Sequence, residues 1–151
     1  MNKAFVREPD MDGRAYCPRC ATEGTPVGAG PLDMHIRDER RSRMQDTAWY
    51  CGYPRCEVAY FNLFESVVLV DELKKSVYPY DLDQPICACF GLDYDDIEAD
   101  VHEQVPSRIK RLLEKSQSSD ARCQTVAVDG QCCMRTVQRL YMKLRAEQSS
   151  R

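Results

Sequence analysis

Short stretches of β-branched and aromatic residues recur in the first half of the chain. Three of them, at residues 47–50, 58–61 and 66–70, are rich in Val, Tyr, Phe and Trp. Such residues suit the pleated, half-buried surface of a sheet. The pattern therefore predicts short strands at these positions and a small β module in this half of the chain.

The second half has the spacing of helices instead. Apolar residues recur every three or four positions in three groups: Ile97, Val101 and Val105; Ile109, Leu112 and Leu113; and Val137, Leu140, Tyr141 and Leu144. This period places each group on one helix face. Asp93 precedes the first group as an N-cap, and Pro106 separates it from the second. We expect one helix from residue 93, one after residue 106, and one over about 132–147.

A turn-rich segment separates the two halves. Residues 78–85 read Tyr-Pro-Tyr-Asp-Leu-Asp-Gln-Pro, with two prolines in eight positions. The expected fold is therefore α+β: a zinc-ribbon-like β module over residues 1–78, a linker over 79–85, and a helical module over 86–151.

Composition adds that nine of the 151 residues are cysteine. Residues 1–12 contain no apolar leader and begin with the initiator Met, which favours a cytoplasmic location. Cysteines in a reducing compartment indicate metal or redox chemistry rather than disulfides. The net charge is −3, so we expect no nucleic-acid partner. The longest aliphatic run, residues 67–70, is too short for membrane insertion.

The first four cysteines have the spacing of a zinc site. Cys17 and Cys20 form a C-x2-C turn, and Cys51 and Cys56 form a C-x4-C turn that contains Gly and Pro. Two such turns can supply the four thiolates of a structural Zn²⁺ site. Each pair alone could be buried free thiols. A redox-active C-x-x-C is the other alternative, but it usually lies within a βαβ pattern, which is absent here.

The remaining five cysteines favour an iron–sulfur cluster. Cys87 and Cys89 form a C-x-C pair, Cys123 follows 34 positions later, and Cys132 and Cys133 are adjacent. Two thiolates so close can ligate one iron of a [2Fe-2S] cluster while a distant pair ligates the other. The residue pattern leaves the fourth ligand open between Cys132 and Cys133, because one residue of helix rotates a side chain by about 100°.

Other polar features are interpreted as ordinary surface. The arginines of residues 37–43 are expected in a solvated loop or on a docking surface for an acidic partner, and the acidic residues of 93–103 on a solvated helix face that could also steer a redox partner. His35 and His102 are interpreted as packing or surface residues rather than ligands. No Ser/His/Asp pattern and no phosphate-binding Gly-rich loop is present. We expect a carrier or metal-handling protein rather than an enzyme.

The order of motifs resembles the N-terminal domain of CopZ-type copper chaperones, whose cluster module is similar to the bacterioferritin-associated ferredoxin-like fold. The matching motifs are C-P-R-C at 17–20, Cys51 with Cys56, I-C-A-C-F at 86–90, Cys123, and Gly130 with Cys132-Cys133. The resemblance implies zinc at Cys17, Cys20, Cys51 and Cys56. It also implies a [2Fe-2S] cluster at Cys87, Cys89, Cys123 and Cys133. The full chaperones also have a Cu(I)-binding M-x-C-x-x-C loop, and these 151 residues contain none.

Three functions are consistent with this sequence. The first is a zinc- and [2Fe-2S]-binding redox protein in copper handling, which reduces the metal ion for a copper-transport ATPase or chaperone. The second is a generic electron-transfer ferredoxin that docks to a redox enzyme. The third is a structural interaction module with zinc at both sites.

Overall fold

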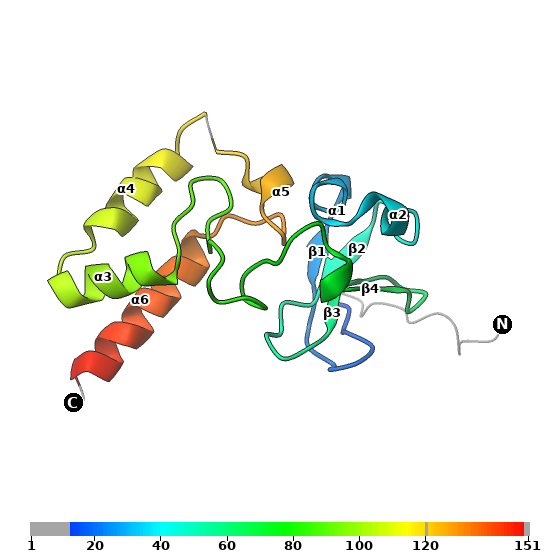
Figure 1. Cartoon of the computed structure of the whole chain (residues 1–151), viewed down its shortest axis with the longest axis horizontal. Helices are drawn as coiled ribbons and strands as arrows, with labels where there is room; N and C mark the ends of the chain where they lie inside the picture. Colours follow the sequence, from blue (N-terminus) through cyan, green and yellow to red (C-terminus); the bar gives the residue numbers. More distant parts are fainter. Residues whose placement is uncertain (1–12, 120, 150–151) are drawn as a thin grey trace.

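A computed structural model describes residues 13–119 and 121–149 of the chain. The predicted absence of a leader concerns residues 1–12, which lie outside this part. The elements are β1 (Thr25–Val27), α1 (Ala29–His35), α2 (Asp38–Arg41), β2 (Ala48–Tyr50), β3 (Val58–Phe61), β4 (Val67–Leu69), η2 (Val70–Glu72), α3 (Tyr94–Glu103), α4 (Ser107–Ser116), α5 (Cys123–Val126) and α6 (Met134–Ser149). The strands with α1 and α2 lie at one end of the molecule, and α3, α4 and α6 at the other (Figure 1).

The described strands form one antiparallel sheet of four, in the order β1-β2-β3-β4. The register places Tyr50 opposite both Thr25 and Tyr60, and Tyr60 opposite Val68. Every residue of β2 and β3 is buried, because these central strands are covered on both faces. The strands expected at 47–50, 58–61 and 66–70 are confirmed.

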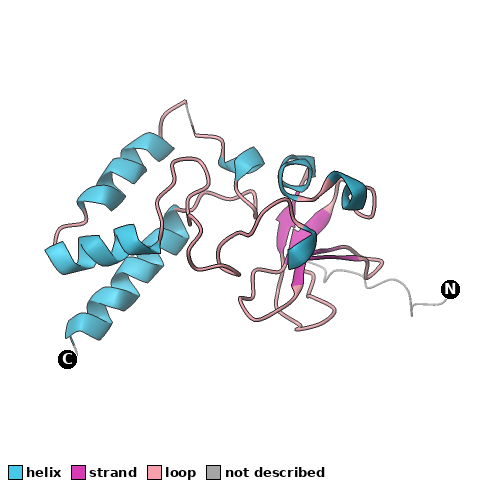
Figure 2. Cartoon of the chain, in the orientation of Figure 1, coloured by secondary structure: helices cyan, strands magenta, loops and turns pink. Residues whose placement is uncertain are grey.

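The N-terminal half is not wholly β, in contrast to the expected ribbon-like module. Pro31, Leu32 and His35 are buried on one side of α1, which packs beside the sheet (Figure 2). The arginine-rich stretch forms α2 rather than a loop. Three of its four arginines are paired with carboxylates: Arg41 with Asp33 and Asp46, and both Arg40 and Arg43 with Glu72. The fourth, Arg37, donates to Leu73 O.

The helices of the second half follow the predicted boundaries. Asp93 caps α3 by accepting a hydrogen bond from the Asp96 amide at 2.9 Å, and the Asp93 amide donates to the Asp96 carboxylate at 3.1 Å. The corner between α3 and α4 is built on Asp100, which is fully buried. Its carboxylate accepts hydrogen bonds from the Ile109 amide at 2.9 Å and from the Arg108 amide at 3.2 Å. This carboxylate satisfies donors in the first turn of α4 and so fixes the angle between α3 and α4.

The short helix α5 joins the two ends of the molecule. It lies against α1, far from α5 in sequence, rather than against the other C-terminal helices (Figure 1). Val128, just after α5, packs against the N-terminal core, as does Tyr80 of the segment expected to be a linker. The three-part division at residues 78 and 85 remains a prediction, and these contacts cross it.

None of the helices that the structure describes has both the length and the apolar character needed to span a bilayer.

Candidate metal centres

Two turns bring the first four cysteines together. In the first turn, the Cys17 amide donates to Thr22 O at 2.8 Å and the Ala21 amide donates to Cys17 O at 2.9 Å, which curls the backbone around Cys17 and Cys20. In the second, Cys51 directly follows β2, the chain reverses at Gly52 with φ of 74°, and Cys56 precedes β3. Cys51 and Cys56 therefore flank the connection between β2 and β3, and Cys17 and Cys20 lie in a turn that precedes β1.

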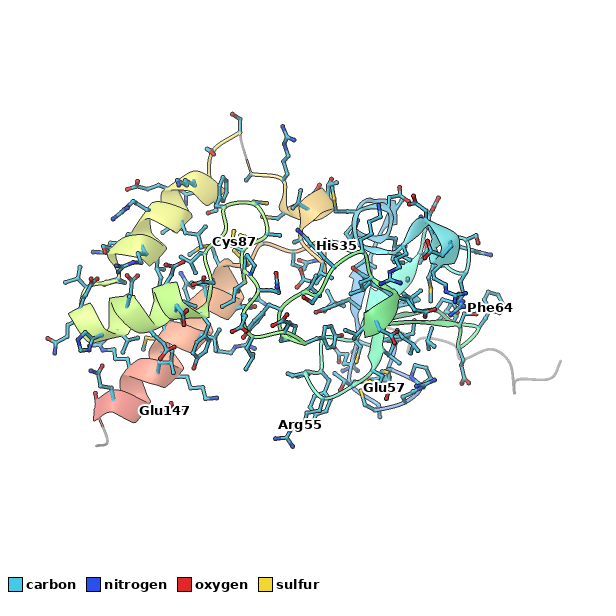
Figure 3. The ribbon with its side chains drawn as sticks, in the orientation of Figure 1. His35, Arg55, Glu57, Phe64, Cys87 and Glu147 are labelled. Carbon is cyan, nitrogen blue, oxygen red and sulfur yellow. The ribbon has the colours of Figure 1, made fainter. Side chains whose placement is uncertain are left out.

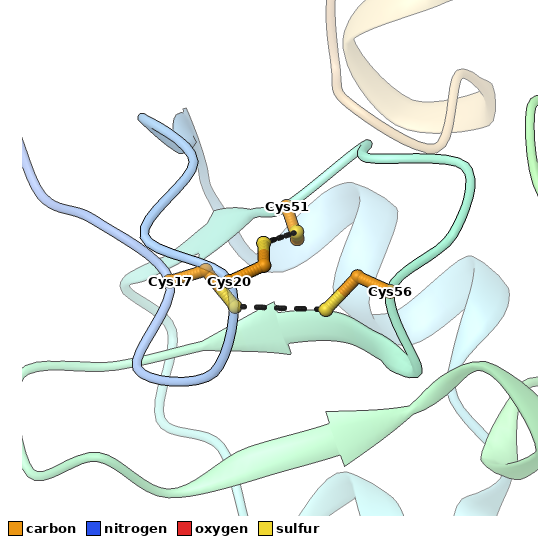
Figure 4. Close-up of side chains that lie close together, drawn as sticks. All are labelled: Cys17, Cys20, Cys51 and Cys56. Atoms are coloured by element: carbon orange, nitrogen blue, oxygen red, sulfur yellow. Dashed lines mark hydrogen bonds between the residues drawn. The ribbon is translucent and has the colours of Figure 1, made fainter.

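The four sulfur atoms form a compact group (Figure 4). Cys17 Sγ lies 3.9 Å from Cys56 Sγ, and Cys20 Sγ lies 3.5 Å from Cys51 Sγ. All four lie within 4.8 Å of one another. A tetrahedral site with metal–sulfur bonds of about 2.3 Å requires sulfur–sulfur separations of about 3.8 Å. The arrangement therefore has the size and shape of a zinc site with four thiolate ligands.

The environment of these thiols is largely apolar. Cys17 and Cys51 are buried beside Trp49, Val58 and Phe61. Burial raises the pKa of the Cys51 and Cys56 thiols, so in the metal-free protein these groups hold their protons. Burial acts in the same direction on Cys20, but hydrogen bonding to Thr22 outweighs it and lowers the pKa to about 7. Zinc binding must therefore displace protons, as is usual for thiolate sites.

The other cysteines gather where the C-x-C loop, α5 and the start of α6 meet. Cys89 Sγ lies 3.7 Å from Cys123 Sγ, and the Cys133 thiol is hydrogen-bonded to Cys87. Figure 3 shows Cys87 in the loop between the helices. Each pair joins one residue of the C-x-C segment to one distant residue. The expectation that Cys87 and Cys89 ligate the same iron remains a prediction. Their burial differs accordingly: Cys87 is 1% exposed and faces the helical core, while Cys89 is only partly buried.

Cys132 and Cys133 are separated by their surroundings. Cys133 is packed against the helical core and contacts Cys87, whereas Cys132 is exposed. The amide of Val137 donates to Cys133 O at 3.0 Å, which attaches Cys133 to the first turn of α6.

Backbone donors surround the Cys87 sulfur. The amides of Cys89, Phe90 and Gly91 donate to it, and Gly91 has φ of 80°, a conformation that suits glycine. The pKa of Cys87 is lowered to about 6, first by the hydrogen bond from Cys133 and then by these amides. Burial raises the pKa of Cys123 to about 12. Amides directed at a cysteine sulfur stabilise the thiolate and are typical of iron–sulfur sites.

Two residues contact the backbone at the end of α5 and just after it, and neither carried a signal of this role in the sequence. His35 is a buried packing residue as expected, but its Nε2 also contacts Val126 O at 2.6 Å. Tyr60 donates to Val128 O. Both bonds end on backbone carbonyls, which no sequence pattern reveals.

Comparisons with known proteins agree with the first of these sites. Residues 14–74 match a family model described as a zinc binding domain, of the CopZ type. This match and the four-cysteine group support Zn²⁺ at the N-terminal site. The stretch has the signature of a CopZ-type zinc-binding domain.

A curated relative and a solved structure extend the comparison. The copper chaperone CopZ of Archaeoglobus fulgidus is 31% identical over 74 residues, which are 49% of this chain and 36% of that protein. The matched region is thus about a third of that relative's length. The X-ray structure of the A. fulgidus CopZ N-terminal domain superposes with a TM-score of 0.70 at 23% identity, over 83% of this chain and 97% of that one. The family match ends at residue 74, but the structural similarity covers 83% of the chain. The shared fold therefore extends into the C-terminal helices.

Proposed function

We propose that the chain is a zinc- and [2Fe-2S]-binding redox protein of copper handling. Zinc would be held by Cys17, Cys20, Cys51 and Cys56, where it stabilises the sheet module. The cluster would be held by Cys87, Cys89, Cys123 and Cys133, with Cys132 outside the ligand set. A bound [2Fe-2S] cluster accepts and donates one electron at a time.

The grouping of the second set of thiols carries this proposal. All nine cysteines lie in the described part of the chain, yet only the first four form a compact group of ligand atoms. The four cysteines proposed as cluster ligands lie instead as two pairs, Cys89 with Cys123 and Cys87 with Cys133. Two pairs suit two irons, whereas a single zinc ion needs one cage. The amides directed at Cys87 are also what an anionic cluster requires.

The copper assignment draws on the relative named a copper chaperone. We propose that one electron passes to Cu(II), which becomes Cu(I), the form that soft thiolate ligands bind. The electron is resupplied by a redox partner protein, a low-potential one-electron donor. The product would go to a copper-transport ATPase or chaperone in the cytoplasm.

Metal content tests the cofactor assignment. Protein purified anaerobically with iron and sulfide supplied should contain about two irons and one zinc per chain and give an EPR signal on reduction. Zinc at both sites with no iron would overturn the cluster assignment and favour the structural zinc module.

The copper role is tested separately. The reduced protein is mixed anaerobically with Cu(II) in the presence of a Cu(I)-specific chelator, and the visible absorption of the oxidised cluster and the Cu(I) complex are followed together. Equal amounts of both products are expected. A cluster that a donor protein reduces but that Cu(II) does not oxidise would identify a generic ferredoxin instead.

A further inference from the structure

We propose that His35 and Tyr60, in the zinc-binding half, are positioning residues for the cluster ligands. Their side chains fix the segment that carries Cys123 and Cys133, so retention of the cluster depends on a contact made by the other half of the molecule. The inference rests on the proposed function, because it concerns the same cluster.

Two buried donors hold two nearby backbone carbonyls. His35, which is 6% exposed, contacts Val126 O through Nε2 at 2.6 Å. A carbonyl can only accept, so His35 donates and carries its proton on Nε2. Tyr60 is fully buried in β3, and its hydroxyl donates to Val128 O at 2.5 Å. The carbonyls of Val126 and Val128 lie on either side of Ala127 and are thus fixed from two different elements, α1 and β3.

Local hydrogen bonds carry this constraint to a ligand. The Ala127 amide donates to Cys123 O at 3.1 Å, and the Gly130 amide donates to Ala127 O at 3.0 Å. Cys123 begins α5, a helix of four residues. One turn of helix is not stable alone, so its position must come from tertiary contacts. Within the described residues, the element with which α5 makes its main contacts is α1.

The backbones of α1 and α5 approach closely where they meet. A Cβ on Gly30 would lie 3.2 Å from both Gln124 O and Thr125 Cα, so glycine permits this contact. On the other side, a Cβ on Gly130 would lie 3.3 Å from Pro31 Cγ. Glycines therefore stand on both sides of the contact between α1 and the segment that ends in Cys133.

Five variants test this clamp, by which His35 and Tyr60 attach residues 123–133 to the N-terminal half. Tyr60→Phe and His35→Leu each remove one donor to the segment. Gly30→Ala improves helix propensity but pushes α1 away from α5 without touching the core. Tyr80→Phe is the matched control. It also removes a tyrosine hydroxyl from the cluster of aromatic rings, but the bonds of this hydroxyl go to Gly52 and Val58 and not to residues 123–133.

The readouts are zinc content and the rate at which visible absorption is lost in the presence of an iron chelator. Tyr60→Phe, His35→Leu and Gly30→Ala are expected to keep their zinc and to lose the cluster about tenfold faster than the wild type. For the first two, this factor corresponds to the loss of one buried hydrogen bond. Tyr80→Phe is expected to lose it at the wild-type rate. His35→Gln, whose side-chain amide can donate, is expected to recover part of the stability.

Unchanged rates of cluster loss in Tyr60→Phe, His35→Leu and Gly30→Ala would overturn the clamp. Loss of zinc in parallel with the cluster would also overturn it, because the variants would then act by unfolding the N-terminal half. A wild-type protein without iron would instead refute the proposed function. The clamp would then be judged in the zinc-loaded, iron-free protein from the alkylation rates of Cys123 and Cys133. Faster alkylation in Tyr60→Phe and His35→Leu than in Tyr80→Phe supports it, and equal rates overturn it.

Discussion

At the scale of single residues, the grouping of thiols distinguishes the zinc site from the proposed cluster site. Cys17, Cys20, Cys51 and Cys56 point at one common centre, so removal of any one leaves an incomplete cage. In the second set, neighbours in sequence have different surroundings. Cys133 contacts Cys87 in the helical core, and Cys132 points to solvent. A cysteine's chemistry here depends on which face of its segment it occupies.

Cys133→Ser and Cys132→Ser are therefore expected to differ sharply. The first removes one thiol of the Cys87 pair and should abolish the reduced-state EPR signal, because a hydroxyl is a poor substitute for a soft thiolate. The second should leave iron content and signal unchanged. The reverse result would mean that Cys132 is the fourth ligand and that the metal-bound start of α6 is rotated.

The zinc site gives a second prediction. Cys17→Ser or Cys56→Ser should lose zinc and unfold the sheet module, because structural zinc supplies about 10–16 kcal/mol of binding free energy to such sites. Trp49 is the only tryptophan and is buried beside these thiols, so its fluorescence reports this module alone. Unchanged Trp49 emission and thermal stability in a zinc-free Cys17→Ser protein would contradict a structural role.

At the scale of elements, the helical half depends on a polar corner as well as on apolar packing. Asp100 is fully buried at the end of α3 and accepts the amides of Arg108 and Ile109, so it takes the place of an N-cap for α4. Pro106, which precedes α4, has no side chain that can cap it. The buried carboxylate is therefore the only side-chain acceptor given to these two amides in the described structure.

Asp100→Ala should lower the free energy of unfolding of the helical half by about 2–4 kcal/mol, because it leaves two backbone donors unsatisfied near the core. Denaturant unfolding followed by circular dichroism measures the change. Glu103→Ala is the control, since it removes an exposed carboxylate that pairs with Arg108 and should leave the midpoint nearly unchanged. Asp100 also pairs with Arg108 Nη1 at 3.0 Å. Equal effects of the two changes would show that Asp100 stabilises the helical half only through this ion pair.

At the scale of the whole molecule, the features that the sequence predicted are those encoded by neighbouring residues. The C-x2-C and C-x4-C turns, the three main helices and the Asp93 cap each depend on side chains within a few positions of one another. The attachment of α5 and the residues after it to the N-terminal half depends on contacts between residues far apart in the sequence. His35 and Tyr60 bond to carbonyls 91 and 68 positions away, so neither spacing nor residue type indicated them. For the same reason α5 and its attachment to α1 were not predicted.

Removal of zinc tests whether the two halves act as one structure. The zinc turn is connected through buried tyrosines to the segment proposed to carry cluster ligands. Cys51 directly follows Tyr50, the Tyr50 ring packs on Tyr60, and Tyr60 donates to Val128 O. A zinc chelator should therefore change Trp49 fluorescence first and then accelerate the loss of cluster absorption in the same sample. The same chelator saturated with zinc is the control for direct attack on iron. Cluster loss at an unchanged rate after the Trp49 signal has shifted would mean that the helical half holds its cluster without the zinc module.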